Sequence, residues 1–136
     1  MSKIKVIPCS GIGKALGLIS RETVLQVTNN LSKDEAETVC LAHVVTGDKD
    51  AVDKVKNQIC ITVDGCPALC AAKSVEHAGG IIKAKYRVVD EMKKHRGKDA
   101  GTGTTLTDAG WQIVDEFAEE ISKHVTQLSK EGSNHE

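Results

Sequence analysis

The chain has 136 residues, of which 40% are apolar and 27% are charged, and its formal net charge is −1. This length is typical of one domain with its own core, and a near-neutral charge with scattered lysines argues against nucleic acid as a partner. No stretch reaches the roughly 18 apolar residues that a membrane span needs, and the apolar run at the N-terminus is too short for a signal peptide. We therefore expect a cytoplasmic protein with no membrane partner.

The part of the chain before residue 93 alternates predicted strands with predicted helices. Short apolar and β-branched runs predict strands at residues 3–7, 59–63 and 81–89, and at residues 38–45 a strand or a strand that turns into a loop. Helical spacing of apolar residues and helix-start signals predict helices at residues 13–31, 48–56 and 67–77. This order predicts an α/β fold with a mainly parallel sheet of about four strands, flanked by helices.

The C-terminal part of the chain has a different pattern. Residues 93–105 are charged and then rich in Gly and Thr, which predicts a flexible connector. Residues 106–130 predict a long amphipathic C-terminal helix. Its apolar face is expected to consist of Trp111, Val114, Ala118, Ile121, Val125 and Leu128. We therefore divide the chain into a core of residues 1–92, the connector, and a helix that packs on this core or on the second subunit of a homodimer.

Cysteines fall near the expected carboxyl ends of the strands. Cys9 follows the first strand, Cys40 lies on or at the end of the second, and Cys66 follows the third after a tight turn. Cys70 is one helical turn further on. Because the carboxyl ends of parallel strands lie at one edge of a sheet, we expect these thiols to converge. Cys60, inside the third strand, is expected to be a core residue on the opposite face from its strand neighbours.

Spacing alone leaves two interpretations of the converging thiols open: a site for metal binding or thiol chemistry, or a group of inert core residues. In a reducing compartment, a group of cysteines favours metal binding or thiol chemistry over disulfides. Zinc would hold tetrahedral sulfurs about 3.8 Å apart, a distance that neighbouring strands and one helical turn can match. Buried cysteines are also common as inert core residues, and the short Cys-x2-Cys pairs of zinc fingers are absent here.

Three motifs resemble the DGC domain, a family named for its central Asp-Gly-Cys sequence. They are Pro8-Cys9-Ser10-Gly11-Ile12-Gly13-Lys14, Ser20-Arg21-Glu22, and Asp64-Gly65-Cys66 followed by Cys70-Ala71. The resemblance covers about residues 4–90 and leaves the C-terminal helix unmatched. It implies one bound zinc ion and no particular reaction. The ligands that it implies are Cys9, Cys40, Cys66 and Cys70.

Other residues near the cysteines are candidates for an outer shell around the metal or for a weak anion site at the start of the first helix. They are Ser10, Gly11, Gly13, Lys14, Arg21 and Asp64. The glycines do not complete a nucleotide-binding motif, because Leu16 and Ala15 occupy positions where such motifs need other residues. Close packing is the simpler role for the glycines, and a turn is the simpler role for Asp64. His43 is expected at the surface or in a loop.

Three functional hypotheses follow from the sequence. The first is a protein, not an enzyme, that holds zinc in a closed four-thiolate site and acts in metal handling or through an unidentified protein partner, because a closed site has no open position for a substrate. The second is a redox or sulfur-handling protein whose thiols hold an Fe–S cluster, carry a persulfide or form a disulfide. The third is an enzyme with a three-cysteine metal site and Cys66 or Cys70 as its nucleophile.

Overall fold

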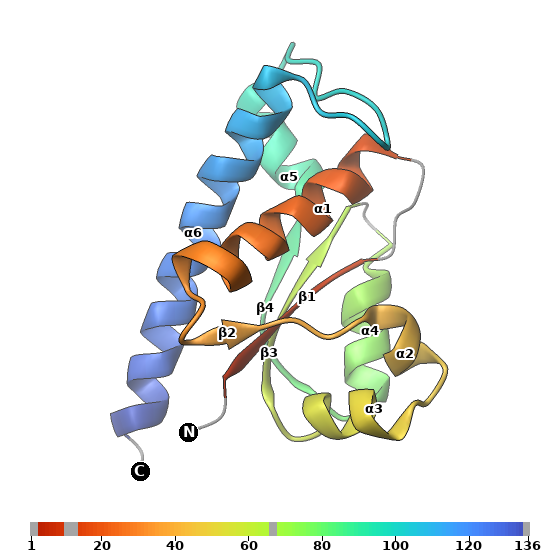
Figure 1. Ribbon diagram of the computed structural model, residues 1–136, viewed down its shortest axis with the longest axis vertical. Coiled ribbons are helices and arrows are strands. Elements are labelled where there is room, and N and C mark those ends of the chain that lie inside the picture. The colour runs from red at the N-terminus through yellow and green to blue at the C-terminus, as the bar shows by residue number, and fades with distance from the viewer. Residues whose placement is uncertain (1–2, 10–13, 66–67, 135–136) are drawn as a thin grey trace.

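The computed structural model describes residues 3–9, 14–65 and 68–134 (Figure 1). Its central feature is a four-stranded sheet in which all paired strands are parallel, in the order β2-β1-β3-β4. The strands are β1 (Ile4–Pro8), β2 (Ala36–Glu37), β3 (Ile59–Asp64) and β4 (Ile81–Arg87). Helices cover both faces of this sheet, which confirms the predicted α/β fold.

Alternate residues of β1 and β3 enter two separate cores, because side chains alternate across a strand. Val6 and Ile61 belong to the core on one face of the sheet. Ile7 and Cys60 belong to the core on the other face. All of these side chains are 0% exposed, as expected for a continuous apolar strand that is covered on both sides. Cys60 is therefore a core residue.

The larger core lies beneath α1 (Ala15–Gln26), its π-helical continuation η1 (Val27–Leu31), α5 (Val88–Met92) and α6 (Asp108–Asn134). The long helix α6 packs beside α1 and buries Phe117 and Ile121 (Figure 1). Trp111 was expected on this apolar face but is 46% exposed. Gly110 is the buried residue at this point and packs closely against Ala100, which turns the neighbouring Trp111 outward. Neither α6 nor any other described helix is long and apolar enough to span a membrane.

The smaller core lies beneath three short helices, α2 (Leu41–Val45), α3 (Lys49–Val55) and α4 (Cys70–His77). The predicted strand at residues 38–45 is wrong. Only Ala36 and Glu37 pair with β1, and the chain then forms α2, which buries Leu41 and Val44. The sequence pattern could not reveal this, because a short apolar run fits a strand and a buried helix equally well.

Two further element boundaries differ from the prediction. The helix expected from Pro67 begins at Cys70, because Leu69 has a left-handed backbone (φ 56°) that interrupts a right-handed helix. Pro67 itself lies outside the described residues. The strand expected at residues 81–89 ends at Arg87, where α5 begins.

The segment that connects α5 to α6 is held by local hydrogen bonds. It contains a short 3-10 helix, η2 (Lys93–His95), and an antiparallel bridge between Gly101 and Leu106. Leu106 is buried in the larger core. The Thr107 hydroxyl oxygen accepts a hydrogen bond from the Gly110 N–H (3.1 Å) and so caps the start of α6.

Candidate metal centre

The carboxyl ends of β1 and β3 lie side by side and carry two parts of the proposed site. Cys9 directly follows β1, and its N–H donates to the carbonyl oxygen of Val63 in β3 (2.9 Å). Asp64 ends β3, and Gly65 comes next. The Gly65 N–H donates to the sulfur of Cys9, with an N···S distance of 3.1 Å. Cys9 is only 8% exposed, so a protein amide supplies a hydrogen bond where water has little access.

This environment fits a sulfur that binds metal as a thiolate. An amide N–H directed at a sulfur stabilises negative charge on it, and the thiolate is the form that binds metal ions. Thiolates are the main ligands of structural zinc and of Fe–S clusters. The sulfur of Cys9 is therefore a suitable ligand for zinc or for an Fe–S cluster.

The backbone of α1 packs so closely on Gly65 that a larger residue would be obstructed. A Cβ atom at this position would lie 3.1 Å from backbone atoms of Leu16 and Gly17. Backbone atoms in a helix cannot move aside one at a time, so a side chain here would displace the end of the helix. Ser20 adds a second connection, because its hydroxyl donates to the carbonyl oxygen of Val63 (2.6 Å). Helix α1 thus fixes the amide that faces Cys9.

Asp64 holds the start of α4. Its buried carboxylate accepts hydrogen bonds from the N–H groups of Ala71 (2.7 Å) and Ala72 (3.3 Å). These amides lie in the first turn of α4, where N–H groups have no partner within the helix. Burial raises the pKa of the Asp64 carboxyl above its ordinary value, and the two amide hydrogen bonds act in the opposite direction. Asp64 therefore ties the end of β3 to the helix that begins with Cys70.

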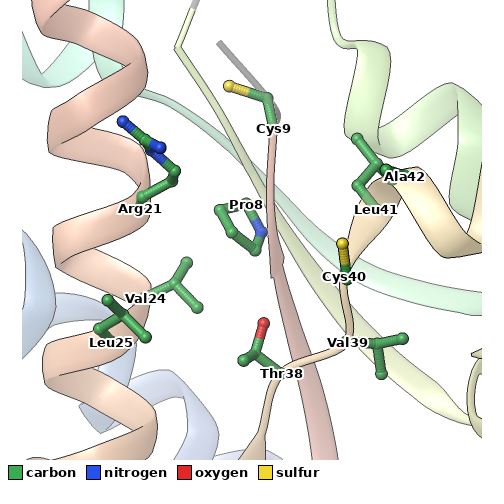
Figure 2. A pocket seen from close by; sticks show the side chains of 10 residues that line it. All are labelled: Pro8, Cys9, Arg21, Val24, Leu25, Thr38, Val39, Cys40, Leu41 and Ala42. Carbon is green, nitrogen blue, oxygen red and sulfur yellow. The ribbon is translucent and has the colours of Figure 1, made fainter. Parts of the chain in front are cut away.

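Cys40 and Cys70 have exposed thiols at the starts of two helices. Cys40 immediately precedes α2, and Cys70 is the first residue of α4. Cys9 and Cys40 line the same cavity, between α1 and the segment that leads into α2 (Figure 2). Cys70 does not line this cavity, and Cys66 lies outside the described residues. Within residues 3–9, 14–65 and 68–134, no three His, Cys, Asp or Glu side chains are close enough together to hold a metal ion.

The other candidate residues occupy different positions around this edge. Ser10, Gly11 and Gly13, which the sequence suggests as outer-shell or anion-site residues, lie outside the described residues. Lys14 is exposed just before α1. Arg21 lies on α1 and lines the same cavity as the two cysteines, and its buried Nε has no hydrogen-bond partner in the described part of the chain (Figure 2). His43 is exposed, with its Nδ1 3.1 Å from a carboxylate oxygen of Asp48.

Sequence reasoning did not identify the cavity or the place of Arg21 in it. Val24 and Leu25 are consecutive residues of α1, and both contribute to its wall, although Leu25 is 41% exposed. Helical spacing predicts which residues of α1 face the core, but it does not predict a gap beside the helix. The gap depends on where the chain turns away from β1 after β2, and no local sequence signal specifies that point.

Comparison with known proteins gives a family. A model of the DGC domain matches residues 5–128, whereas no curated protein and no solved structure matches the chain. The match extends well beyond residues 4–90, where the resemblance was recognised, and includes β4, the connecting segment and most of α6. It covers nearly the whole chain. The chain therefore belongs to the DGC domain family.

Proposed function

We propose that the protein binds one zinc ion and acts in metal handling or as a module that binds another protein. The proposed ligands are the thiolates of Cys9, Cys40, Cys66 and Cys70. Membership of the DGC domain family supports the proposal, because the match includes all four cysteines and the resemblance to this family implies them as ligands. The observation that carries it is the hydrogen bond from the Gly65 N–H to the sulfur of Cys9.

The described part of the Asp-Gly-Cys turn supports a ligand role on both of its sides. On one side, the Gly65 amide stabilises negative charge on the sulfur of Cys9. On the other side, the Asp64 carboxylate holds the first turn of α4, where Cys70 lies. Metal sites depend on such hydrogen bonds behind the ligands, because these bonds orient the ligands and tune their charge.

Zinc, when bound, would cross-link distant segments and contribute part of the folding free energy. The described ligands come from the end of β1, the start of α2 and the start of α4. These short helices cover the smaller of the two cores, so a cross-link would add stability where apolar burial contributes less. A closed site of four thiolates leaves no coordination position for a substrate, and this favours a role other than catalysis.

A redox or sulfur-handling role is the second candidate, and the exposure of two thiols favours it. Cys40 and Cys70 are both accessible from solvent. Accessible thiols are the ones that react with oxidants, disulfides and sulfur donors. In this case the same cysteines would hold an Fe–S cluster, carry a persulfide or form a disulfide.

Purification in the absence of oxygen distinguishes the two candidates. The zinc proposal expects a colourless protein with about one zinc per chain by elemental analysis, as a single four-thiolate site requires. A brown protein that contains iron and acid-labile sulfide would support the second candidate instead. A folded protein with neither metal, in which Cys40 and Cys70 react freely with a maleimide, would contradict the zinc proposal.

A further inference from the structure

A cavity of about 420 Å³ opens beside the proposed metal ligands (Figure 2). Helix α1 forms one wall with Val24 and Leu25, and the segment that leads into α2 forms the other wall with Val39 and Leu41. Its volume is in the range of small-molecule sites, and its lining is mostly aliphatic. A cavity of this kind could hold a small organic molecule.

The shortness of β2 creates this space. The strand pairs with β1 only at Ile4 and Lys5, through Ala36 and Glu37. Beyond this point, the described chain leaves the edge of β1 and runs across to α2 (Figure 1). On the side of β1 that faces β2, the region next to Pro8 is therefore covered by side chains from two separated segments and not by a paired strand.

Arg21 gives the cavity a positive charge, and the described lining holds no carboxylate that could pair with it. The buried Nε of Arg21 has no hydrogen-bond partner in the described part of the chain. A buried donor on a charged group is costly to leave unpaired, and a guanidinium binds a planar carboxylate with two parallel hydrogen bonds.

We propose that this cavity binds a small organic acid with a short aliphatic body. The carboxylate would accept hydrogen bonds from the guanidinium of Arg21, and the aliphatic part would lie against Val24, Leu25 and Leu41. The proposal goes beyond metal binding, because it depends on Arg21 and the aliphatic walls and not on which ion the thiols hold. Arg21 could instead neutralise the charge of nearby thiolates, and a comparison of a charged with an uncharged ligand separates this role from ligand binding.

The test uses the full chain as purified and compares hexanoate with hexanamide, which has the same body without the charge. Titrations are followed by ¹H–¹⁵N NMR, and zinc content is measured on the same samples. We expect saturable shifts at Val24, Leu25 and Val39, with hexanoate binding at least about tenfold more tightly than hexanamide. Arg21→Gln should abolish this preference and leave the weak binding of hexanamide unchanged. Lys14→Gln is the matched control, because Lys14 lies next to α1 but outside the lining, and it should bind hexanoate as the wild type does.

A second variant covers the case in which Arg21→Gln fails to fold. Leu25→Asp changes a half-exposed residue at the cavity wall and should weaken hexanoate by about tenfold or more through charge repulsion, with hexanamide less affected. Equal affinity for hexanoate and hexanamide in the wild type, or shifts confined to surface lysines, would overturn the proposal. If the wild type does not bind hexanoate and Arg21→Gln loses its zinc, the proposal is also wrong. Arg21 then serves to neutralise the charge of the thiolates. Hexanoate binding to a zinc-free wild type would leave this inference standing and contradict only the zinc proposal.

Discussion

Two buried cysteines on the same face of the sheet have opposite environments. Cys9 and Cys60 belong to the same core, but Cys9 follows the carboxyl end of β1, whereas Cys60 lies near the amino end of β3. The sulfur of Cys9 accepts a hydrogen bond from the Gly65 N–H, whereas the thiol of Cys60 donates one to the carbonyl oxygen of Gln58 (3.3 Å). Burial raises the pKa of the Cys60 thiol to about 11, although the positive charge of Lys5 acts in the opposite direction.

This difference shows how position along a parallel strand determines the chemistry of a buried thiol. A carbonyl acceptor stabilises the protonated S–H form, and an amide donor stabilises a charged sulfur. At the carboxyl ends of parallel strands, the following turns and helix starts present N–H groups. Cys9 is therefore suited to bind a metal ion, and Cys60 is suited to remain an inert core residue.

The largest expected effect concerns metal content in matched alanine variants of these two residues. Cys9→Ala should lose essentially all bound zinc, because a ligand is removed, whereas Cys60→Ala should retain about one zinc per chain. Elemental analysis and circular dichroism on both proteins check this. The substitutions remove the same buried group, so a general packing defect would affect both. If Cys60→Ala lost its zinc and Cys9→Ala kept it, the assignment of Cys9 as a ligand and of Cys60 as an inert core residue would be wrong.

The larger core, on the other face of the sheet, should contribute to the stability of the fold but not to the metal site. Phe117 of α6 is 1% exposed, and its ring packs edge-to-face on Tyr86 with centroids 5.7 Å apart. Phe117→Ala should lower the free energy of unfolding by about 3–5 kcal/mol, because it leaves a large cavity in the core. Zinc stoichiometry in the folded protein should not change. Urea denaturation and zinc analysis test both statements, and a well-folded variant without zinc would show that α6 takes part in the site.

A smaller effect is expected at Gly65, the residue against which the backbone of α1 packs. Gly65→Ala introduces a Cβ only 3.1 Å from backbone atoms of Leu16, so stability should fall by about 1–3 kcal/mol. The shift of the Gly65 amide away from Cys9 should also weaken zinc binding by about 10–100-fold, as measured by chelator competition. Gly47→Ala is the control, because Gly47 has a left-handed backbone (φ 80°) with open space around it. It should lose stability and keep its zinc affinity; an equal loss of affinity in both variants would argue against the role of the turn.

The smallest effect is a pH dependence that arises from Cys60. In the unfolded chain a thiol ionises near its ordinary pKa of 9.0, whereas the folded protein holds the proton of Cys60 up to about 11. The unfolded state therefore releases this proton first, and the stabilisation, which is complete below pH 9, is lost as pH rises from 9 to 11. The stability of the wild type relative to Cys60→Ala should fall by about 1–2 kcal/mol between pH 8 and pH 10.5. Urea denaturation at both pH values measures it, and a constant difference would show that Cys60 is not protected by burial.

The sequence predicted a parallel sheet from the alternation of strands and helices along the chain, because the signals for these elements are local. The continuous apolar run at residues 59–63 is sufficient to predict a strand covered on both faces. The same type of signal failed at residues 38–45, where Leu41 and Val44 are buried by a helical turn and not by a strand. The start of α4 was misplaced because the left-handed Leu69 is not a residue type that marks such a conformation.

The sequence suggests cysteine ligands for the candidate site, and this stays a prediction, but it does not suggest the contacts around them. Gly65 and Cys9 are 56 residues apart, and the contact of their amide and sulfur depends on β1 and β3 being neighbours in the sheet. The hydrogen bonds from Ala71 and Ala72 to Asp64 depend on α4 beginning at Cys70, after the left-handed Leu69, and the pattern did not reveal this start. Long-range contacts of this kind leave no mark on spacing, and so only the ligand types could be predicted from the sequence.

X-ray absorption at the zinc K edge tests the proposed site most directly, because it counts and identifies the atoms bound to the metal. The measurement is made on the wild-type protein and on Cys60→Ala, both as purified. We predict the same spectrum for both proteins, with four sulfur atoms at about 2.3 Å and no nitrogen or oxygen ligand. A shell with fewer than four sulfurs, or a change in the shell when Cys60 is removed, would contradict the assignment of Cys9, Cys40, Cys66 and Cys70 as the complete ligand set.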